Sequence, residues 1–188
     1  VQADANTGHG FAIFMASVGT LRLRLRRRLT WALGQNRNTV PVFERASASD
    51  VPALSDLLSV LFTQEVEFQP DTQAQHKGLS AIISNPELGA ILVAREDSEI
   101  LAMVNLLFTV STAIGERVAI LEDMIVSPSA RGTGIGSSLL TYAIDFARIS
   151  GVKRITLLTD SENTPAQRFY GKHGFSMSSM VPLRLTLS

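Results

Sequence analysis

Cysteine is absent from this 188-residue sequence, and histidines and long apolar runs are scarce. The absence of cysteine excludes disulfide bonds, thiolate metal ligands and a cysteine nucleophile. The histidines, His9, His76 and His173, lack the paired spacing of a metal site, so we expect no metal. No apolar run approaches the ~20 residues of a membrane-spanning helix, so we expect no membrane span.

The sequence also lacks an excess of either charge, since 17 Lys and Arg residues balance 17 Asp and Glu residues. This balance excludes a strongly basic nucleic-acid binder, so nucleic acid is an unlikely partner. With 45% hydrophobic residues, the chain can bury a sizeable core, and its length fits one domain with an appendage. We expect a soluble protein located in the cytoplasm.

The neutral total conceals two segments of opposite charge that meet near Pro41. Residues 1–41 hold six arginines and one aspartate, a net charge of +5, and the remaining 11 basic and 16 acidic residues give −5. We therefore predict a basic N-terminal extension over 1–40 and a globular domain over 41–188. The extension is predicted to be poorly ordered or loosely docked. Two alternatives remain, a transit peptide and an arm that binds nucleic acid or anionic lipid.

From residue 40 onward, hydrophobic periodicity and turn residues predict alternating strands and helices. The predicted order is β-α-α-β-β-β-α-β-α-β, an α/β arrangement around a mixed sheet. The predicted strands cover 40–45, 90–95, 100–110, 117–126, 154–159 and 181–187, and the predicted helices cover 51–61, 72–83, 134–149 and 164–173.

The segment 121–140 carries the most specific motif, a strand, a glycine-rich turn and a helix start. Glycines at 132, 134 and 136 leave backbone N–H groups unobstructed at a positive helix terminus, an arrangement suited to a pyrophosphate. A dinucleotide-binding fingerprint would require glycine where Ser137 stands. A nucleoside-triphosphate loop would require a lysine, and none lies between 77 and 153. The remaining alternative is a tight turn without a ligand.

This turn resembles the acetyl-CoA loop of the GNAT superfamily of N-acyltransferases, whose pattern is Arg/Gln-x-x-Gly-x-Gly/Ala. Arg131, Gly134 and Gly136 fill that pattern, and Asn163 and Tyr170 match the asparagine and tyrosine that usually follow it. The resemblance covers about 41–187 and implies a GNAT-type fold, a mixed, mostly antiparallel sheet flanked by helices. It also implies acetyl-CoA as cosubstrate. Within the superfamily, the segment from Leu121 is most similar to polyamine and other small-amine acetyltransferases.

By the same resemblance, each motif acquires a role in acetyl transfer. The backbone of Met124, Ile125 and Val126 would pair with the pantetheine arm of the cosubstrate. Asn163 would bind the side of that arm, and Tyr170 would protonate the CoA sulfur. Glu122 is the candidate base, with Asp123 expected on the opposite face of the strand. The residues that would hold the pyrophosphate are Arg131, Gly132, Thr133, Gly134, Ile135, Gly136 and Ser137.

Each of these roles has a structural alternative. Tyr170 could be a core aromatic residue, Asn163 a helix N-cap, and Glu122 a partner of Arg117 or a solvated strand residue. His173, just before a glycine, is interpreted as a cation at a helix C-terminus.

The acceptor is expected to be a small-molecule or peptide amine. Three acids in 64–71, together with Glu122 and Asp123, would attract a cation, although 64–71 could equally be a solvated loop. Polyamine, amino acid, aminoglycoside and peptide terminus all remain open. The predicted function is transfer of an acetyl group from acetyl-CoA to a primary amine by direct attack. The alternative is a non-catalytic acyl-CoA-binding sensor or scaffold with a basic arm. A homodimer is possible, because the last strand of this fold often pairs across a dimer.

Overall fold

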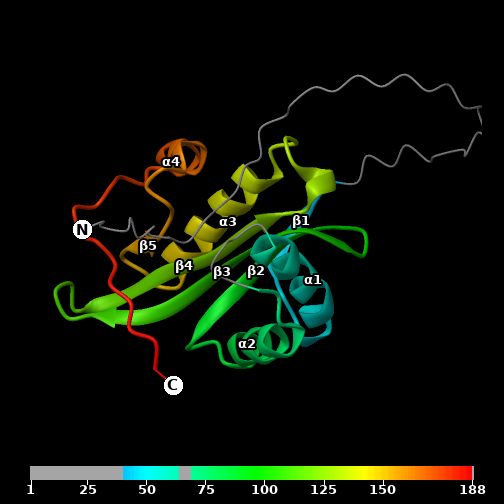
Figure 1. Cartoon of the computed structure of the whole chain (residues 1–188), viewed down its shortest axis with the longest axis horizontal. Helices are drawn as coiled ribbons and strands as arrows, with labels where there is room; N and C mark the ends of the chain where they lie inside the picture. The colour runs from blue at the N-terminus through cyan, green and yellow to red at the C-terminus, as the bar shows by residue number, and fades with distance from the viewer. Residues whose placement is uncertain (1–39, 64–68, 188) are drawn as a thin grey trace, which may run out of the picture.

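The computed structural model describes residues 40–63 and 69–187, so the extension over 1–39 and the acids Glu65 and Glu67 lie outside the described residues. The described chain folds into one sheet with helices on both faces (Figure 1). Its elements are β1 (Val42–Arg45), η1 (Ala48–Asp50), α1 (Val51–Phe62), α2 (Thr72–Ser84), β2 (Gly89–Glu96), β3 (Glu99–Ser111), β4 (Glu116–Val126), η2 (Pro128–Ala130), α3 (Ile135–Ile149), β5 (Ile155–Leu157) and α4 (Thr164–Gly171).

The sheet has the strand order β1-β2-β3-β4-β5. All neighbouring strands run antiparallel except β4 and β5, which run parallel. In Figure 1, α1 and α2 lie on one side of the sheet, while α3 and α4 lie on the other. The structure thus confirms the predicted mixed, mostly antiparallel sheet flanked by helices.

Alternating side chains of the central strands form two hydrophobic layers. Leu92 of β2 and Val104 of β3 pack with Leu139 of α3 in one layer. Ile91, next to Leu92 in the chain, packs with Leu54 of α1 in the other layer. Because both faces of the sheet are covered, β2 and β3 are apolar at nearly every position rather than at every second one.

Two aspartate side chains organise the chain before α1 and at the start of α2. Asp50 accepts hydrogen bonds from the Ser47 N–H (2.8 Å) and the Ser47 hydroxyl (2.9 Å), which organises the turn leading into α1. Asp71 accepts from the N–H groups of Gln73 and Ala74, both at 3.0 Å, at the start of α2. Asp71, the described acid of the segment 64–71, is therefore an N-cap.

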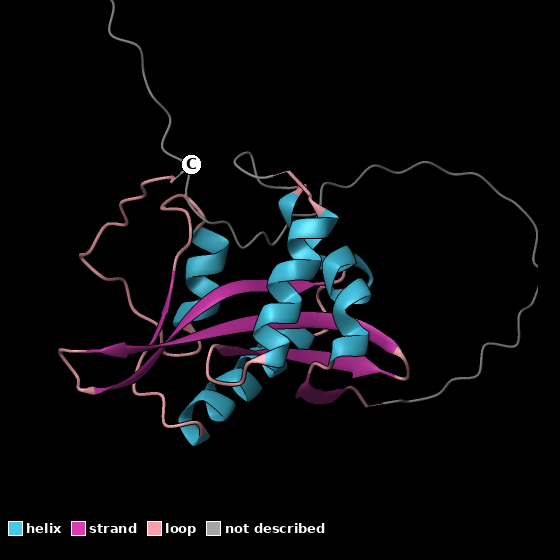
Figure 2. Cartoon of the chain, turned by 90° about the horizontal axis from the view of Figure 1, so that it is seen from below, coloured by secondary structure: helices cyan, strands magenta, loops and turns pink. Residues whose placement is uncertain are grey.

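The predicted strand over 181–187 is wrong, since the chain after α4 is irregular (Figure 2). The alternating apolar residues that suggested a strand are exposed, and Leu183 is 95% exposed. A strand requires a partner that supplies hydrogen bonds, and the segment pairs with none of the described strands. The alternating pattern alone could not predict whether a partner strand is present.

None of the helices in the described ranges is both long enough and apolar enough to cross a membrane.

Candidate functional site

The sheet opens at the end of β4, where the candidate site lies. The parallel pairing with β5 ends at Leu121, which lies opposite Leu157. On its other side, β4 remains paired with β3 as far as Val126, opposite Ala102. Beyond Leu121, the edge of β4 that faces β5 therefore has no partner strand in the described chain. That edge includes Met124, Ile125 and Val126, the three residues predicted to pair with a pantetheine arm.

A glycine turn follows directly and leads into α3. Gly132 (φ 79°) and Gly134 (φ 88°) adopt left-handed conformations that are unfavourable for residues with a side chain. The first hydrogen bond of α3 runs from the Ser138 N–H to the Gly134 carbonyl at 3.1 Å. The N–H groups of the helix's first turn precede this bond and have no intrahelical acceptors, so they can bind an anion.

Two side chains hold the turn in place. Arg131 Nε donates to the Val126 carbonyl at 3.2 Å, which ties the turn to the end of β4. The Thr133 hydroxyl donates to the Ala130 carbonyl at 2.7 Å. This contact uses only Nε of Arg131, and the guanidinium carries further N–H donors on its two terminal nitrogens. The arrangement fits a doubly charged pyrophosphate better than a neutral group.

Tyr170 of α4 contacts the same strand end from the α3 and α4 side. Its ring is 2% exposed, and its hydroxyl donates to the Met124 sulfur at 3.8 Å. Phe169 and Phe175 meet the ring edge-on, with centroid distances of 5.2 and 5.4 Å. Burial raises the pKa of Tyr170 above its ordinary value, so the phenol keeps its proton at neutral pH. Tyr170 is thus a core aromatic residue whose hydroxyl can still serve as a proton donor.

Asn163 is the N-cap of α4, as the structural alternative proposed. Its Oδ1 accepts from the Ala166 N–H at 3.1 Å. Asn163 precedes Tyr170 by seven residues, about two helical turns, so both lie on the same side of α4. Contact between Asn163 and a cosubstrate stays a prediction.

His173 has a contact that the sequence did not predict. Its Nε2 lies 2.9 Å from the Ser137 hydroxyl, so the residues after α4 meet the first turn of α3. Its placement before Gly174 suggested only a helix-end cation. No sequence signal indicated the contact, because 36 residues separate the two partners.

A β-bulge determines where Glu122 and Asp123 lie. Val104 pairs with Met124 and Leu106 with Leu121, so Glu122 and Asp123 together oppose the single residue Asn105. Asn105 Nδ2 donates to Asp123 Oδ2 at 3.3 Å. Both Val104 and Leu106 belong to the layer that packs on α3, so Asn105 faces α1 and α2.

The expectation that Asp123 lies on the face opposite Glu122 is therefore wrong, because the bulge interrupts the alternation of β4. Leu121 and Met124 belong to the same hydrophobic layer although they are three residues apart. Glu122 and Asp123, which stand between them, both lie on the α1 and α2 side. Glu122 lies there by alternation from Leu121, and Asp123 lies there because it bonds to Asn105. The bulge thus brings two carboxylates to one face at the open end of β4.

The two carboxylates differ in environment. Burial raises the pKa of Asp123 to about 6; the hydrogen bond from Asn105 lowers it and the neighbouring charge of Glu122 raises it further. Both Glu122 and Asp123 are partly buried by surface area, and Asp123 alone is given a hydrogen bond by Asn105. Arg117, considered as its partner, instead pairs with Glu87 and lies 5.2 Å from the centroid of the Phe108 ring. Either carboxylate could accept a proton at this strand end.

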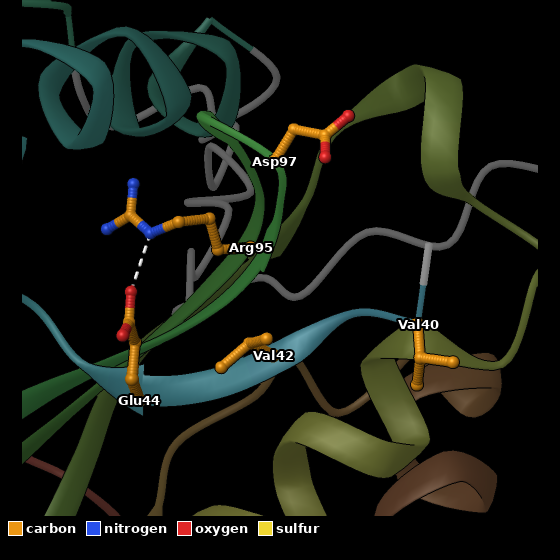
Figure 3. A pocket seen from close by; sticks show the side chains of 5 residues that line it. All are labelled: Val40, Val42, Glu44, Arg95 and Asp97. Atoms are coloured by element: carbon orange, nitrogen blue, oxygen red, sulfur yellow. Dashed lines mark hydrogen bonds and ion pairs between the residues drawn. The ribbon is translucent and has the colours of Figure 1, made fainter. Parts of the chain in front are cut away.

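A shallow surface pocket of about 340 Å³ lies elsewhere, along β1 and the β2–β3 turn (Figure 3). Arg95 lines it and donates from Nε to Glu44 at 2.6 Å, while Asp97 points away from that pair. None of the predicted site residues lines this pocket. Over the described ranges, no three His, Asp or Glu side chains are grouped so as to hold a metal ion. The expected absence of a metal stays a prediction.

Comparison with known proteins places this geometry in a family context. The sequence matches the acetyltransferase (GNAT) family over residues 51–175. It is 35% identical over 134 residues to the uncharacterized N-acetyltransferase YhfO of Bacillus subtilis, covering 70% of this chain and 87% of the relative. It is 27% identical over 146 residues to the aminoalkylphosphonate N-acetyltransferase of Salmonella typhimurium, covering 77% and 92%. A crystal structure titled as a probable acetyltransferase superimposes with a TM-score of 0.68 at 25% identity, covering 78% and 98%.

Proposed function

The chain belongs to the GNAT family of acetyl-CoA-dependent N-acetyltransferases, and we propose that it acetylates a primary amine by direct attack in a ternary complex. The observation that carries this proposal is the open edge of β4, since its pairing with β5 ends at Leu121. The backbone of Met124–Val126 lies there beside the glycine turn, with no partner strand on that side among the described strands. A pantetheine arm offers amide groups of the kind that such an edge can pair with.

Binding of the cosubstrate is assigned to three groups of residues. The backbone of Met124, Ile125 and Val126 pairs with the pantetheine arm, and Asn163 binds the side of that arm. Bound acetyl-CoA supplies an activated acetyl group as a thioester. The pyrophosphate is held by Arg131 and by the turn and helix start, which comprise Gly132, Thr133, Gly134, Ile135, Gly136 and Ser137. In support, the helix start presents backbone N–H groups without intrahelical acceptors.

Proton movement is assigned to residues on opposite faces of the sheet. Glu122, on the α1 and α2 side, accepts the proton that an aliphatic amine with a pKa near 10 must lose before it can attack. The amine nitrogen then forms a bond to the acetyl carbon, the carbon–sulfur bond breaks, and the nitrogen releases its second proton to solvent, from which Tyr170 regains the proton that it gives to sulfur. Tyr170, on the α3 and α4 side, donates its phenolic proton to the leaving sulfur. The raised pKa of Tyr170 supports this role, because the phenol is protonated at the pH of the reaction.

The acceptor is proposed to be a small-molecule or peptide amine. Two observations support an amine. The residues after Pro41 carry a net charge of −5, from 11 basic and 16 acidic side chains, which attracts cations. One relative is named as an acetyltransferase of aminoalkylphosphonates, which are small molecules with an amino group.

An activity screen tests the proposed reaction. The full chain is incubated with acetyl-CoA and a panel of polyamines, amino acids, aminoglycosides and short peptides, and free thiol is followed. We expect amine-dependent thiol release. Binding of acetyl-CoA without thiol release for any amine would contradict the proposal and favour a non-catalytic acyl-CoA-binding sensor.

A pair of matched variants tests the proposed base. Glu122→Gln should lower the rate about 10²-fold, because a positioned general base typically contributes 10²–10⁴-fold. Glu116→Gln, at the exposed start of β4, should leave the rate unchanged. Equal rates for the two variants would remove Glu122 from the mechanism.

We also propose a homodimer and a cytoplasmic location, where acetyl-CoA is available to enzymes. The exposed alternating residues Val181, Leu183, Leu185 and Leu187 support a dimer, since a strand from a second copy could cover them. Sedimentation equilibrium of the full chain and of a variant ending at residue 180 tests this. A monomeric full chain would contradict it.

A further inference from the structure

Asn105 is a buried amide whose carbonyl oxygen has no hydrogen-bond partner among the described residues. Its side chain lies in β3 and is 4% exposed. Its Nδ2 donates to Asp123, whereas its Oδ1 accepts no hydrogen bond within the described part of the chain. Buried polar atoms are almost always hydrogen-bonded, so an unpartnered acceptor at this depth indicates a missing donor.

The bond to Asp123 sets the orientation of the amide. An ionised carboxylate only accepts hydrogen bonds, so Asn105 must turn Nδ2 toward it and leave Oδ1 as the unsatisfied atom. No Lys, Arg or His among the described residues pairs with Asp123. The pair therefore offers acceptors on both residues and needs a ligand with several N–H donors. A phosphate or carboxylate would not fit.

Asn105 and Asp123 lie close to the residues that are assigned to the proposed reaction. Asp123 directly precedes Met124, whose side chain meets the Tyr170 hydroxyl at 3.8 Å. Asn105 and Asp123 lie on the α1 and α2 side of the sheet, and Tyr170 lies on the α3 and α4 side. A donor group bound to the pair would thus lie beside the open edge of β4, across the strand from the phenol.

We propose that Asn105 and Asp123 form the subsite that binds the acceptor's amino group, with Asn105 Oδ1 and the Asp123 carboxylate accepting its N–H hydrogens. This inference rests on the proposed function and deepens it. It makes Asn105 a substrate-binding residue and predicts selection for amines that carry N–H donors over quaternary ammonium ions of equal charge. Glu122, next to the pair, keeps its role as base. The raised pKa of Asp123 agrees with the geometry, because a partly desolvated carboxylate without a cationic partner is stabilised by binding one.

A binding measurement without acetyl-CoA tests the subsite directly. n-Butylammonium and butyltrimethylammonium are titrated into the ¹⁵N-labelled full chain, and the side-chain amide signal of Asn105 is followed by NMR. The signal is assigned by its loss in Asn105→Leu. We expect n-butylammonium to shift this signal saturably and butyltrimethylammonium to bind at least tenfold more weakly. An unmoved Asn105 signal, or equal responses to both ions, would overturn the inference.

Kinetics separate this inference from the proposed function. Asn105→Leu should raise KM for the amine at least tenfold while the Kd for acetyl-CoA stays unchanged. Ser55→Ala, also buried on the α1 side, is the matched control and should change neither. If transfer occurs but Asn105→Leu leaves the amine KM unaltered, the subsite is wrong and the function stands. If butylammonium binds at Asn105 but no amine is acetylated, the function is wrong and the subsite stands. Should Asn105→Leu not fold, the wild-type titration, with the signal assigned by triple-resonance NMR, still decides.

Discussion

Burial changes the pKa of two side chains near the open end of β4, the phenol of Tyr170 and the carboxyl of Asp123, with different consequences. It raises the pKa of both Tyr170 and Asp123 because the charged form of each loses hydration. Tyr170 therefore remains a neutral proton donor throughout the physiological range. Asp123, with a pKa of about 6, changes its protonation within that range. One physical cause thus produces a constant proton donor and a titrating carboxylate on opposite faces of one strand.

Replacing the Tyr170 hydroxyl should affect chemistry more than binding. Tyr170→Phe should lower kcat about 10²-fold with little change in acetyl-CoA affinity, because it removes a general acid but keeps the buried ring. Steady-state kinetics and calorimetric titration with acetyl-CoA measure the two quantities. Tyr142, the other tyrosine, packs against Phe43 at 5.9 Å, and Tyr142→Phe is the control that should retain activity. Equal kcat values for both variants would exclude Tyr170 as the acid.

Asp123 should make the folded state less stable as the pH rises from about 4 to about 6. The pKa in the folded state lies above the ordinary value of 3.8, so the folded state binds this proton more tightly than the unfolded state. Its stabilising effect is complete below pH 4 and is lost above pH 6. A rise from 3.8 to about 6 amounts to about 3 kcal/mol, since a tenfold change in proton affinity is worth about 1.4 kcal/mol.

Urea unfolding of the wild type and of Asp123→Asn between pH 4 and pH 8 measures this dependence. The free energy of unfolding of Asp123→Asn should fall less over the window, and the variant should be the more stable protein at pH 7. Parallel pH profiles of the two proteins would contradict the account.

At the scale of elements, local pattern predicted most of the structure, and pairing decided the rest. The apolar spacing and caps around α1 and α3 predicted both helices to within about a residue at each end. The bulge opposite Asn105 could not be predicted, because it depends on how β4 aligns with β3. For the same reason, alternation placed Asp123 on the wrong face and predicted a strand at 181–187. The one sequence feature that could have indicated Asn105 is its amide side chain within an otherwise apolar stretch.

The glycine turn before α3 should bind the cosubstrate through its backbone shape. Gly134→Ala introduces a side chain at φ 88° and should cost about 1–2 kcal/mol of stability. By tilting the first N–H groups of α3, it should also weaken acetyl-CoA binding about tenfold. Calorimetric titration and thermal unfolding measure the two effects.

Gly151, at the other end of α3, provides the matched control. Its φ is 78°, and an added side chain would meet no atom within 4 Å, as at Gly134. Gly151→Ala should therefore lose similar stability but keep its acetyl-CoA affinity. Equal losses of affinity in the two variants would show that general destabilisation, and not the turn, causes the effect.

At the scale of the whole molecule, neutrality results from two parts of opposite charge. The +5 of residues 1–41 and the −5 of the rest cancel, yet every described element lies between 42 and 171. The negative part is compatible with a cationic acceptor, while the anionic cosubstrate is proposed to bind locally to Arg131 and backbone N–H groups. Composition could predict this division, but it could not predict what the basic part does.

We propose that residues 41–188 form the working domain. A variant without residues 1–40 should keep the melting temperature and the kcat/KM of the full chain, because the described residues after 40 pack into two hydrophobic layers with one another. Thermal unfolding and thiol-release kinetics provide the comparison. A lower melting temperature or a loss of activity would show that the extension contributes to the domain.

The central claim is direct transfer from acetyl-CoA to an amine while both are bound. Initial rates measured over a grid of acetyl-CoA and amine concentrations test it most directly, with the N-acetylated product identified by mass spectrometry. The account predicts intersecting lines in double-reciprocal plots and one acetylated amine for each thiol released. Parallel lines, the sign of a covalent acetyl-enzyme, or thiol release without acetylated amine would contradict it.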